Sequence, residues 1–170
     1  YYTLSDAQVS CVATTAVWSE KIAPLAEQLS LRMLIAEHIP ADTDSKSGPP
    51  PLPGIEMQRR AMILYTSGTT SRPKGVVTTH ANIQAQIETL ISAWEWKAED
   101  SIPLFLPLHH IHGIVNILCC ALWSGAAVET FEQFEMRQIL KRVRAGAYSL
   151  FMAVPTIYVK LIAALESLPA

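Results

Sequence analysis

The chain has 170 residues and a formal net charge of −2, and 50% of its residues are hydrophobic while 16% are charged. This composition excludes a disordered tail and predicts a globular domain with a buried core. The small net charge and the lack of a basic block argue against a nucleic-acid partner. The three cysteines have no metal-binding spacing, and they indicate free thiols in an intracellular protein.

The N-terminal part of the sequence predicts a β-α-β unit. Residues 9–14 and 31–36 have the composition of short strands, whereas residues 17–29 carry apolar side chains at helical spacing. This order predicts parallel strands joined by a crossover helix. Residues 37–54 are rich in proline, glycine and small polar side chains, which predicts a surface loop inside one domain, with a domain boundary as the alternative.

The remaining sequence continues the alternation of strands and helices. Its pattern predicts strands at 61–65, 76–79, 102–106, 127–130 and 149–153, and helices at 80–94, 113–123, 134–145 and 155–166. The predicted fold class is therefore α/β.

Two features concern the chain as a whole. The most apolar stretch, residues 114–128, is too short to span a bilayer, so no transmembrane segment is expected. The N-terminus has neither the pattern of a secretory signal nor an initiator methionine. We therefore expect the chain to begin inside a larger protein.

A polar segment follows the predicted strand at 61–65. Residues 66–74, which we name the phosphate-binding segment, read TSGTTSRPK. Hydroxyl and backbone N–H groups can donate hydrogen bonds to phosphate oxygens, glycine lets the backbone bend, and lysine supplies a positive charge. The alternative is a polar turn between two strands. The predicted ATP phosphate ligands are Thr66, Ser67, Gly68, Thr69, Thr70 and Lys74.

The longer string YTSGTTSRPKGVVTTHANI resembles the phosphate-binding signature of the adenylate-forming enzymes, the superfamily that contains acyl-CoA synthetases. Two further stretches, LPLHHIHG at 106–113 and FMAVPTIYVKL at 151–161, resemble later motifs of the superfamily and occur in the same order. The resemblance covers residues 5–165. It departs from the usual pattern at Ser71, where the superfamily has glycine.

The resemblance implies a two-step ligase. A carboxylate attacks the α-phosphate of Mg²⁺-bound ATP to give an acyl-adenylate, and coenzyme A then displaces AMP. It also implies that residues 1–170 are part of the large N-terminal AMP-binding domain, with the C-terminal domain absent, so that this chain alone would be inactive. The alternatives are a truncated relative that binds a nucleotide or a protein without turnover, and a structural product of a split gene.

The histidines at 109, 110 and 112 allow three interpretations. Their spacing suggests metal binding, but no nearby carboxylate or thiol completes a tetrahedral set, so no metal site is predicted. They could also be polar loop residues without a role. The resemblance implies instead that His110 and His112 lie beside the acyl-adenylate.

The acid substrate depends on the lining of the acyl pocket. The motifs around His110 and Phe151 look most like the malonyl-CoA synthetase branch, in which a cation at the position of Lys160 pairs with the second carboxylate of the substrate. A solvated helix lysine is the alternative for Lys160. Medium-chain or aromatic acids stay open, because Ile114, Val115 and Phe151 could form an apolar pocket. The sequence does not fix the oligomeric state, the thiol acceptor or the compartment.

Overall fold

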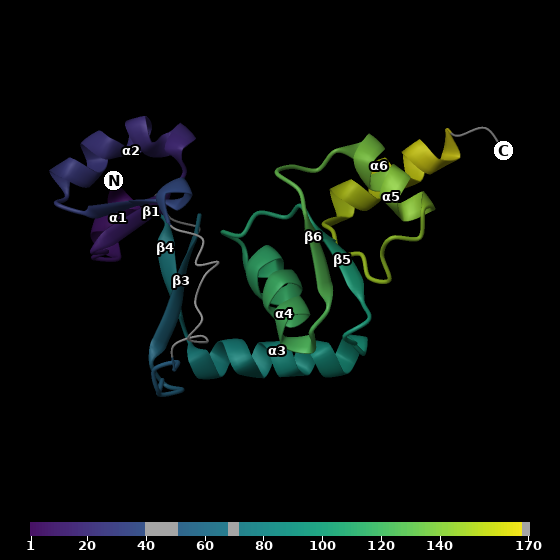
Figure 1. Cartoon of the computed structure of the whole chain (residues 1–170), viewed down its shortest axis with the longest axis horizontal. Coiled ribbons are helices and arrows are strands. Elements are labelled where there is room, and N and C mark those ends of the chain that lie inside the picture. Colours follow the sequence, from purple (N-terminus) through teal and green to yellow (C-terminus); the bar gives the residue numbers. More distant parts are fainter. Residues whose placement is uncertain (40–50, 68–71, 168–170) are drawn as a thin grey trace, which may run out of the picture. The chain divides into compact units, whose positions relative to one another are not determined.

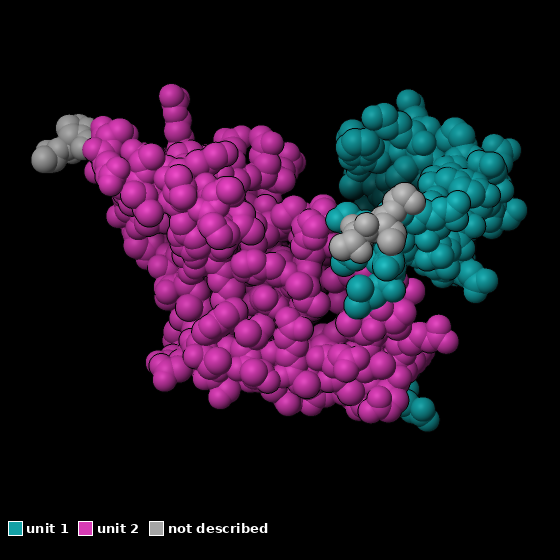
Figure 2. All heavy atoms as spheres, turned by 180° about the vertical axis from the view of Figure 1, so that it is seen from behind, with its two compact units in different colours: residues 1–56, 65–76 teal, residues 57–64, 77–170 magenta. Residues whose placement is uncertain are grey.

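A computed structural model describes residues 1–39, 51–67 and 72–167, which pack into two units. Unit 1 contains residues 1–56 and 65–76, and unit 2 contains residues 57–64 and 77–170 (Figure 2). Helices alternate with strands in both units (Figure 1), so the predicted α/β class is confirmed.

Unit 1 contains the predicted β-α-β unit. Strands β1 and β2 pair in parallel, with Cys11 opposite Arg32 and Thr14 opposite Ile35. Helix α2 connects them, as the apolar spacing of residues 17–29 predicts. The elements of this unit, in chain order, are α1 (Tyr2–Asp6), β1 (Cys11–Thr14), α2 (Ala16–Gln28), β2 (Arg32–Ile35) and the 3-10 helix η1 (Ala36–His38).

Two short helices of unit 1 were not predicted. Helix α1 has five residues and none of them is buried, so it carries no apolar periodicity. The 3-10 helix η1 occupies the start of the stretch that was predicted as a loop from residue 37. The Glu37 carboxylate in η1 accepts a hydrogen bond of 2.9 Å from the backbone N–H of Ala16, at the start of α2.

Strands β3 (Arg60–Thr66) and β4 (Lys74–Thr79) form a two-stranded sheet. Helix α3 (His80–Trp94) follows β4 directly and has the bounds that the sequence predicts. Its start is fixed by a capping box: the Thr79 hydroxyl accepts from the Asn82 N–H at 3.2 Å, and the Asn82 side chain accepts from the Thr79 N–H at 3.0 Å. These two bonds satisfy N–H groups that a helix start leaves without partners.

The main body of unit 2 is a second parallel pair. Strands β5 (Ser101–Leu104) and β6 (Ala127–Thr130) run in register, with Ser101 opposite Ala127 and Leu104 opposite Thr130. The connection between them is the helical segment predicted at 113–123. It begins as a π-helix, η2 (His112–Cys119), and continues as α4 (Cys120–Ser124). Both parts pack against α3 (Figure 1).

The core of unit 2 lies between this helical layer, the β5–β6 pair and helix α5 (Met136–Arg144). Ile102, Ile117 and Ile139 are fully buried and come from β5, η2 and α5. Helix α6 (Pro155–Glu166) adds Leu161 to this cluster. Helix α3 contributes Ile87 to the same cluster.

The predicted strand at 149–153 is wrong. Residues 149 and 150 do lie beside β5, since the N–H groups of Ser149 and Leu150 both donate to the Ser101 carbonyl, at 3.1 and 3.2 Å. No strand follows them among the described residues. The neighbouring position on this edge of β5 is Pro103, which has no N–H to extend the pairing.

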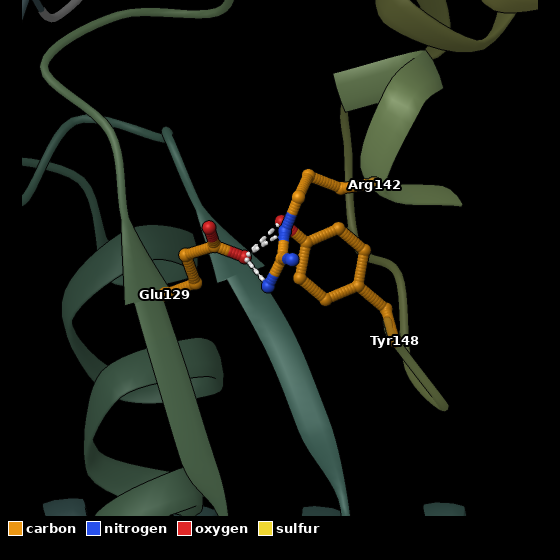
Figure 3. A network of polar contacts seen from close by, with 3 residues as sticks. All are labelled: Glu129, Arg142 and Tyr148. Carbon is orange, nitrogen blue, oxygen red and sulfur yellow. Dashed lines mark hydrogen bonds and ion pairs between the residues drawn. The ribbon is translucent and has the colours of Figure 1, made fainter. Parts of the chain in front are cut away.

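A polar network fastens α5 and the segment after it to β6 (Figure 3). One carboxylate oxygen of Glu129 accepts from the Arg142 guanidinium at 2.8 and 2.9 Å and from the Tyr148 hydroxyl at 2.5 Å. The Tyr148 hydrogen bond and the Arg142 charge hold the pKa of Glu129 below its ordinary value. This network fixes the chain shortly before it enters α6.

The cysteines are free, as predicted, but only Cys120 is buried. Burial, with a smaller contribution from Cys119, raises the pKa of Cys120 to about 11, which keeps it a neutral thiol. In the described ranges, no helix has both the length and the apolar character that crossing a membrane requires.

Candidate functional site

The phosphate-binding segment joins two neighbouring strands. Strand β3 ends at Thr66 and β4 begins at Lys74. Because the connection is too short for a parallel crossover, the two strands run in opposite directions, and Thr66 and Lys74 lie at the same end of the sheet. Thr66, Ser67 and Lys74 are exposed there. A lysine cation and two hydroxyl groups are therefore available to an anion at this end.

The other predicted phosphate ligands are outside the described residues. These are Gly68, Thr69 and Thr70, and the unusual Ser71 also falls in this range. Their assignment stays a prediction.

Tyr65, the residue before the segment, contacts helix α1. Its hydroxyl donates to the Asp6 carboxylate at 2.7 Å, and the Thr3 carbonyl lies 3.2 Å away. The rings of Tyr65 and Tyr2 meet edge to face, with centroids 6.5 Å apart. The hydrogen bond to Asp6 is the largest cause that raises the pKa of Tyr65 to about 12, so its hydroxyl stays a donor through the physiological range.

Arg72, near the other end of the segment, contacts the same helix. Its guanidinium carbon lies 5.8 Å from the centroid of the Tyr2 ring. An open groove with a cavity volume of about 710 Å³ runs along this contact. The groove is lined by Tyr1, Tyr2, Thr3, Ser5, Asp6, Arg72 and Pro73.

The predicted acyl-pocket histidines lie in unit 2, where β5 leads into the π-helix. The backbone N–H of His110 donates to the Pro107 carbonyl at 3.2 Å, and the His110 carbonyl accepts from Gly113 and Ile114. His110 is exposed and its ring lies 4.3 Å from that of His109, whereas His112 is half-buried at the first position of η2. The two predicted histidines therefore flank the start of an irregular helix, a form that is frequent at functional sites.

Gly113 lets the π-helix approach this turn. A Cβ atom at Gly113 would lie 2.5 Å from the Pro107 carbonyl oxygen and 2.9 Å from that of Leu106. Both obstacles are backbone atoms, so no side-chain rotation relieves them. The glycine thus sets the distance between His112 and the preceding turn.

Lys160 lies on the exposed side of α6. In the part of the chain that the structure describes, its side chain has neither a hydrogen bond nor an ion pair, so its charge is available. Phe151, one of the predicted apolar lining residues, is half-buried, and the centroid of its ring lies 5.6 Å from that of the Phe105 ring. The Tyr158 hydroxyl on α6 donates to the Phe151 carbonyl at 3.0 Å and joins this segment to the helix.

A metal site built from side chains is not found among residues 1–39, 51–67 and 72–167: they contain no group of three or more histidine, cysteine, aspartate or glutamate side chains that could hold an ion.

Comparison with known proteins assigns the chain to a family. Residues 1–169 match the family described as AMP-binding enzyme. The chain belongs to this family. The resemblance inferred from the three motifs is thereby confirmed, together with the α/β fold that it implies.

Malonate–CoA ligases are among the similar AMP-binding enzymes. The mitochondrial malonate–CoA ligase ACSF3 of Xenopus laevis is 40% identical over 172 residues, covering 97% of this chain and 30% of that protein. Its human counterpart is 38% identical over 165 residues, covering 94% of this chain and 29% of that protein. The chain therefore spans less than a third of the length of these relatives.

The chain is also similar to solved structures. Apo MatB from Rhodopseudomonas palustris has a TM-score of 0.78 and 25% identity, covering 95% of this chain and 33% of that one. A malonyl-CoA ligase in a ternary product complex with methylmalonyl-CoA and AMP has a TM-score of 0.80 and 28% identity, covering 99% of this chain and 34% of that one.

Sequence reasoning missed the contacts of the phosphate-binding segment with α1. Asp6 and Tyr65 are 59 positions apart, and neither residue alone indicates the other. The one available signal was the position of Tyr65, a hydroxyl-bearing side chain immediately before the segment.

Proposed function

We propose that this chain provides the ATP- and acid-binding residues of an AMP-forming acid–thiol ligase that activates a small dicarboxylic acid such as malonate. The match to malonate–CoA ligases over at least 94% of the chain carries this proposal. The exposed hydroxyl and lysine groups at the end of the β3–β4 sheet support it, because they suit a polyphosphate ligand.

The reaction proceeds in two displacements. A carboxylate oxygen of the acid attacks the α-phosphorus of ATP, and the bond to the bridging oxygen breaks so that pyrophosphate leaves. The thiolate of coenzyme A then attacks the acyl carbon, the bond to the AMP oxygen breaks, and the thiol proton passes to solvent. In the first step, Lys74 and the hydroxyl groups of Thr66 and Ser67 offset charge on the departing pyrophosphate.

The second carboxylate of the acid requires a cation. We assign this role to Lys160, whose side chain is exposed and carries no ion pair with the described residues. Lysine has a point charge and lacks the two parallel N–H donors of arginine. It therefore recognises the negative charge of the second carboxylate more than the orientation of that group. We also assign His110 and His112 to the wall of this proposed pocket.

Mg²⁺ enters this reaction as the partner of ATP. In the proposed reaction the ion would be held chiefly by phosphate oxygens and water, as is usual for Mg²⁺. The names of the two vertebrate relatives include a mitochondrial location, which supports an intracellular location for this protein.

The test is ATP–pyrophosphate exchange by the complete ligase that contains these residues, with malonate, acetate and a medium-chain acid in parallel. We expect exchange with malonate and less with acetate. Exchange only with the medium-chain acid would overturn the substrate assignment. Binding of ATP without exchange for any acid would favour a nucleotide-binding module, and a folded chain that binds neither ATP nor pyrophosphate would overturn the phosphate assignment.

A further inference from the structure

We propose that Asp6 and Tyr2 of helix α1 are positioning residues for the described ligands of the phosphate-binding segment, because they contact Tyr65 and Arg72 near its two ends. The inference rests on the proposed function and adds residues that contact no substrate themselves. It concerns unit 1 alone.

The first end is held by a directional bond. Asp6 accepts the Tyr65 hydroxyl proton at 2.7 Å, and a hydrogen bond to a charged acceptor is stronger than one between neutral groups. The Tyr2 ring, 6.5 Å away at an angle of 77°, restricts rotation of the Tyr65 ring. Because the Tyr65 side chain is held in this way, the backbone of the next residues, Thr66 and Ser67, is held in position as well.

The second end is held by the other contact of Tyr2. The Arg72 guanidinium carbon lies 5.8 Å from the ring centroid, which is within the range of a cation–π interaction. Arg72 precedes Lys74 by two positions, so its placement affects where the lysine emerges at the start of β4. Tyr2 thus contacts the residue before the segment, Tyr65, and a residue near the end of the segment, Arg72.

The charge of Asp6 distinguishes a positioning role from direct binding. A carboxylate repels a polyphosphate, so by electrostatics alone the removal of Asp6 would strengthen phosphate binding. If Asp6 acts through Tyr65, its removal weakens binding in spite of the lost repulsion. The two effects have opposite signs, and a binding measurement separates them.

The experiment measures binding of pyrophosphate and of ATP to the full chain by isothermal titration calorimetry. The variants are Asp6→Ala, Asp6→Asn, Tyr65→Phe and Lys74→Ala, with melting temperatures recorded for each. We expect Asp6→Ala and Tyr65→Phe each to weaken binding by about two- to tenfold, the value of one hydrogen bond. Asp6→Asn should restore most of the affinity, because its carboxamide oxygen still accepts the tyrosine proton.

Two further readouts separate positioning from general loss of structure. The double variant of Asp6→Ala and Tyr65→Phe should bind no worse than either single variant, because both remove the same bond. In an alkaline absorbance titration, Asp6→Ala should lower the pKa of Tyr65 from about 12 toward its ordinary value of 10.0.

The results that would overturn the positioning role differ from those that would overturn the phosphate site. Loss of binding in Lys74→Ala with unchanged binding in Tyr65→Phe and Asp6→Ala would overturn the positioning role and leave the phosphate site intact. Tighter binding in Asp6→Ala would also overturn it. A folded wild-type chain that binds neither pyrophosphate nor ATP would overturn the proposed phosphate site itself.

Discussion

Gly113→Ala should destabilise unit 2 although it adds only a methyl group. The added Cβ would lie 2.5 Å from the Pro107 carbonyl oxygen, which is 0.5 Å inside the 3.0 Å that real Cβ contacts essentially never cross. The Leu106 carbonyl oxygen would lie at 2.9 Å, which is also closer than 3.0 Å. Either the turn at Pro107 or the start of the π-helix has to move.

The cost follows from where this movement would occur. Val115 and Ile117, the next inward residues of η2, are 1% and 0% exposed, so a shift of the helix disturbs the best-packed part of the core. Overpacking of this kind typically costs about 1–3 kcal/mol, and we expect the upper part of that range because both obstacles are backbone atoms. His112 would move as well, so exchange activity with malonate should fall.

The measurement is the free energy of unfolding from urea titration, with two other glycines as controls. Gly54→Ala has nothing within 4 Å of the added Cβ and should leave the free energy nearly unchanged. Gly146→Ala also has open space but a φ of +66°, so it should cost only the backbone strain of about 1–2 kcal/mol. A Gly113→Ala variant as stable as Gly54→Ala would refute the steric argument.

Three further predictions concern charges. Lys74→Ala should weaken ATP and pyrophosphate binding by about tenfold or more, because a charge-assisted contact is lost. The control variant Lys21→Ala should leave both affinities unchanged in isothermal titration calorimetry. Equal losses in the two variants would contradict the assignment of Lys74. In the complete ligase, Lys160→Glu should reduce ATP–pyrophosphate exchange far more with malonate than with acetate, and an equal reduction would contradict the assignment of Lys160 to the acid pocket. The pKa of Glu129 is lowered in the folded chain, so its contribution to stability is present above the ordinary value of 4.5 and is lost as the pH falls through the folded value. Glu129→Gln should therefore flatten the decline of the unfolding free energy below about pH 5, and an unchanged acid profile would refute the role of the network.

The elements that the sequence predicts best are those whose signals are local. Helix α3 has its predicted bounds because its apolar spacing is regular and the Thr79–Asn82 capping box marks its start. Strand β6 likewise has the predicted bounds 127–130. In both cases the residues that define the element lie within it or next to it.

The sequence-based predictions fail where a residue far away in the sequence determines the local structure. The segment 149–153 has the composition of a strand, but the edge that it would join contains Pro103. The segment 113–123 is helical as predicted, but an apolar run without clear periodicity did not distinguish a π-helix from an α-helix. Within the site, the composition of residues 66–74 indicates phosphate binding, whereas the Asp6–Tyr65 bond depends on folding.

The proposed phosphate ligands and the proposed acid-binding residues should respond to mutation separately. The proposed phosphate ligands and their supports belong to unit 1, and the proposed acid-binding residues His110, His112 and Lys160 belong to unit 2. Substitutions at Lys74 or Tyr65 should therefore change pyrophosphate affinity equally for all acids, because pyrophosphate is common to every reaction. Substitution at Lys160 should change the preference among acids and leave pyrophosphate affinity unchanged. A Lys160 variant that loses pyrophosphate affinity, from a chain with an unchanged melting temperature, would mean that the division of roles is wrong and that one group of residues serves both ligands.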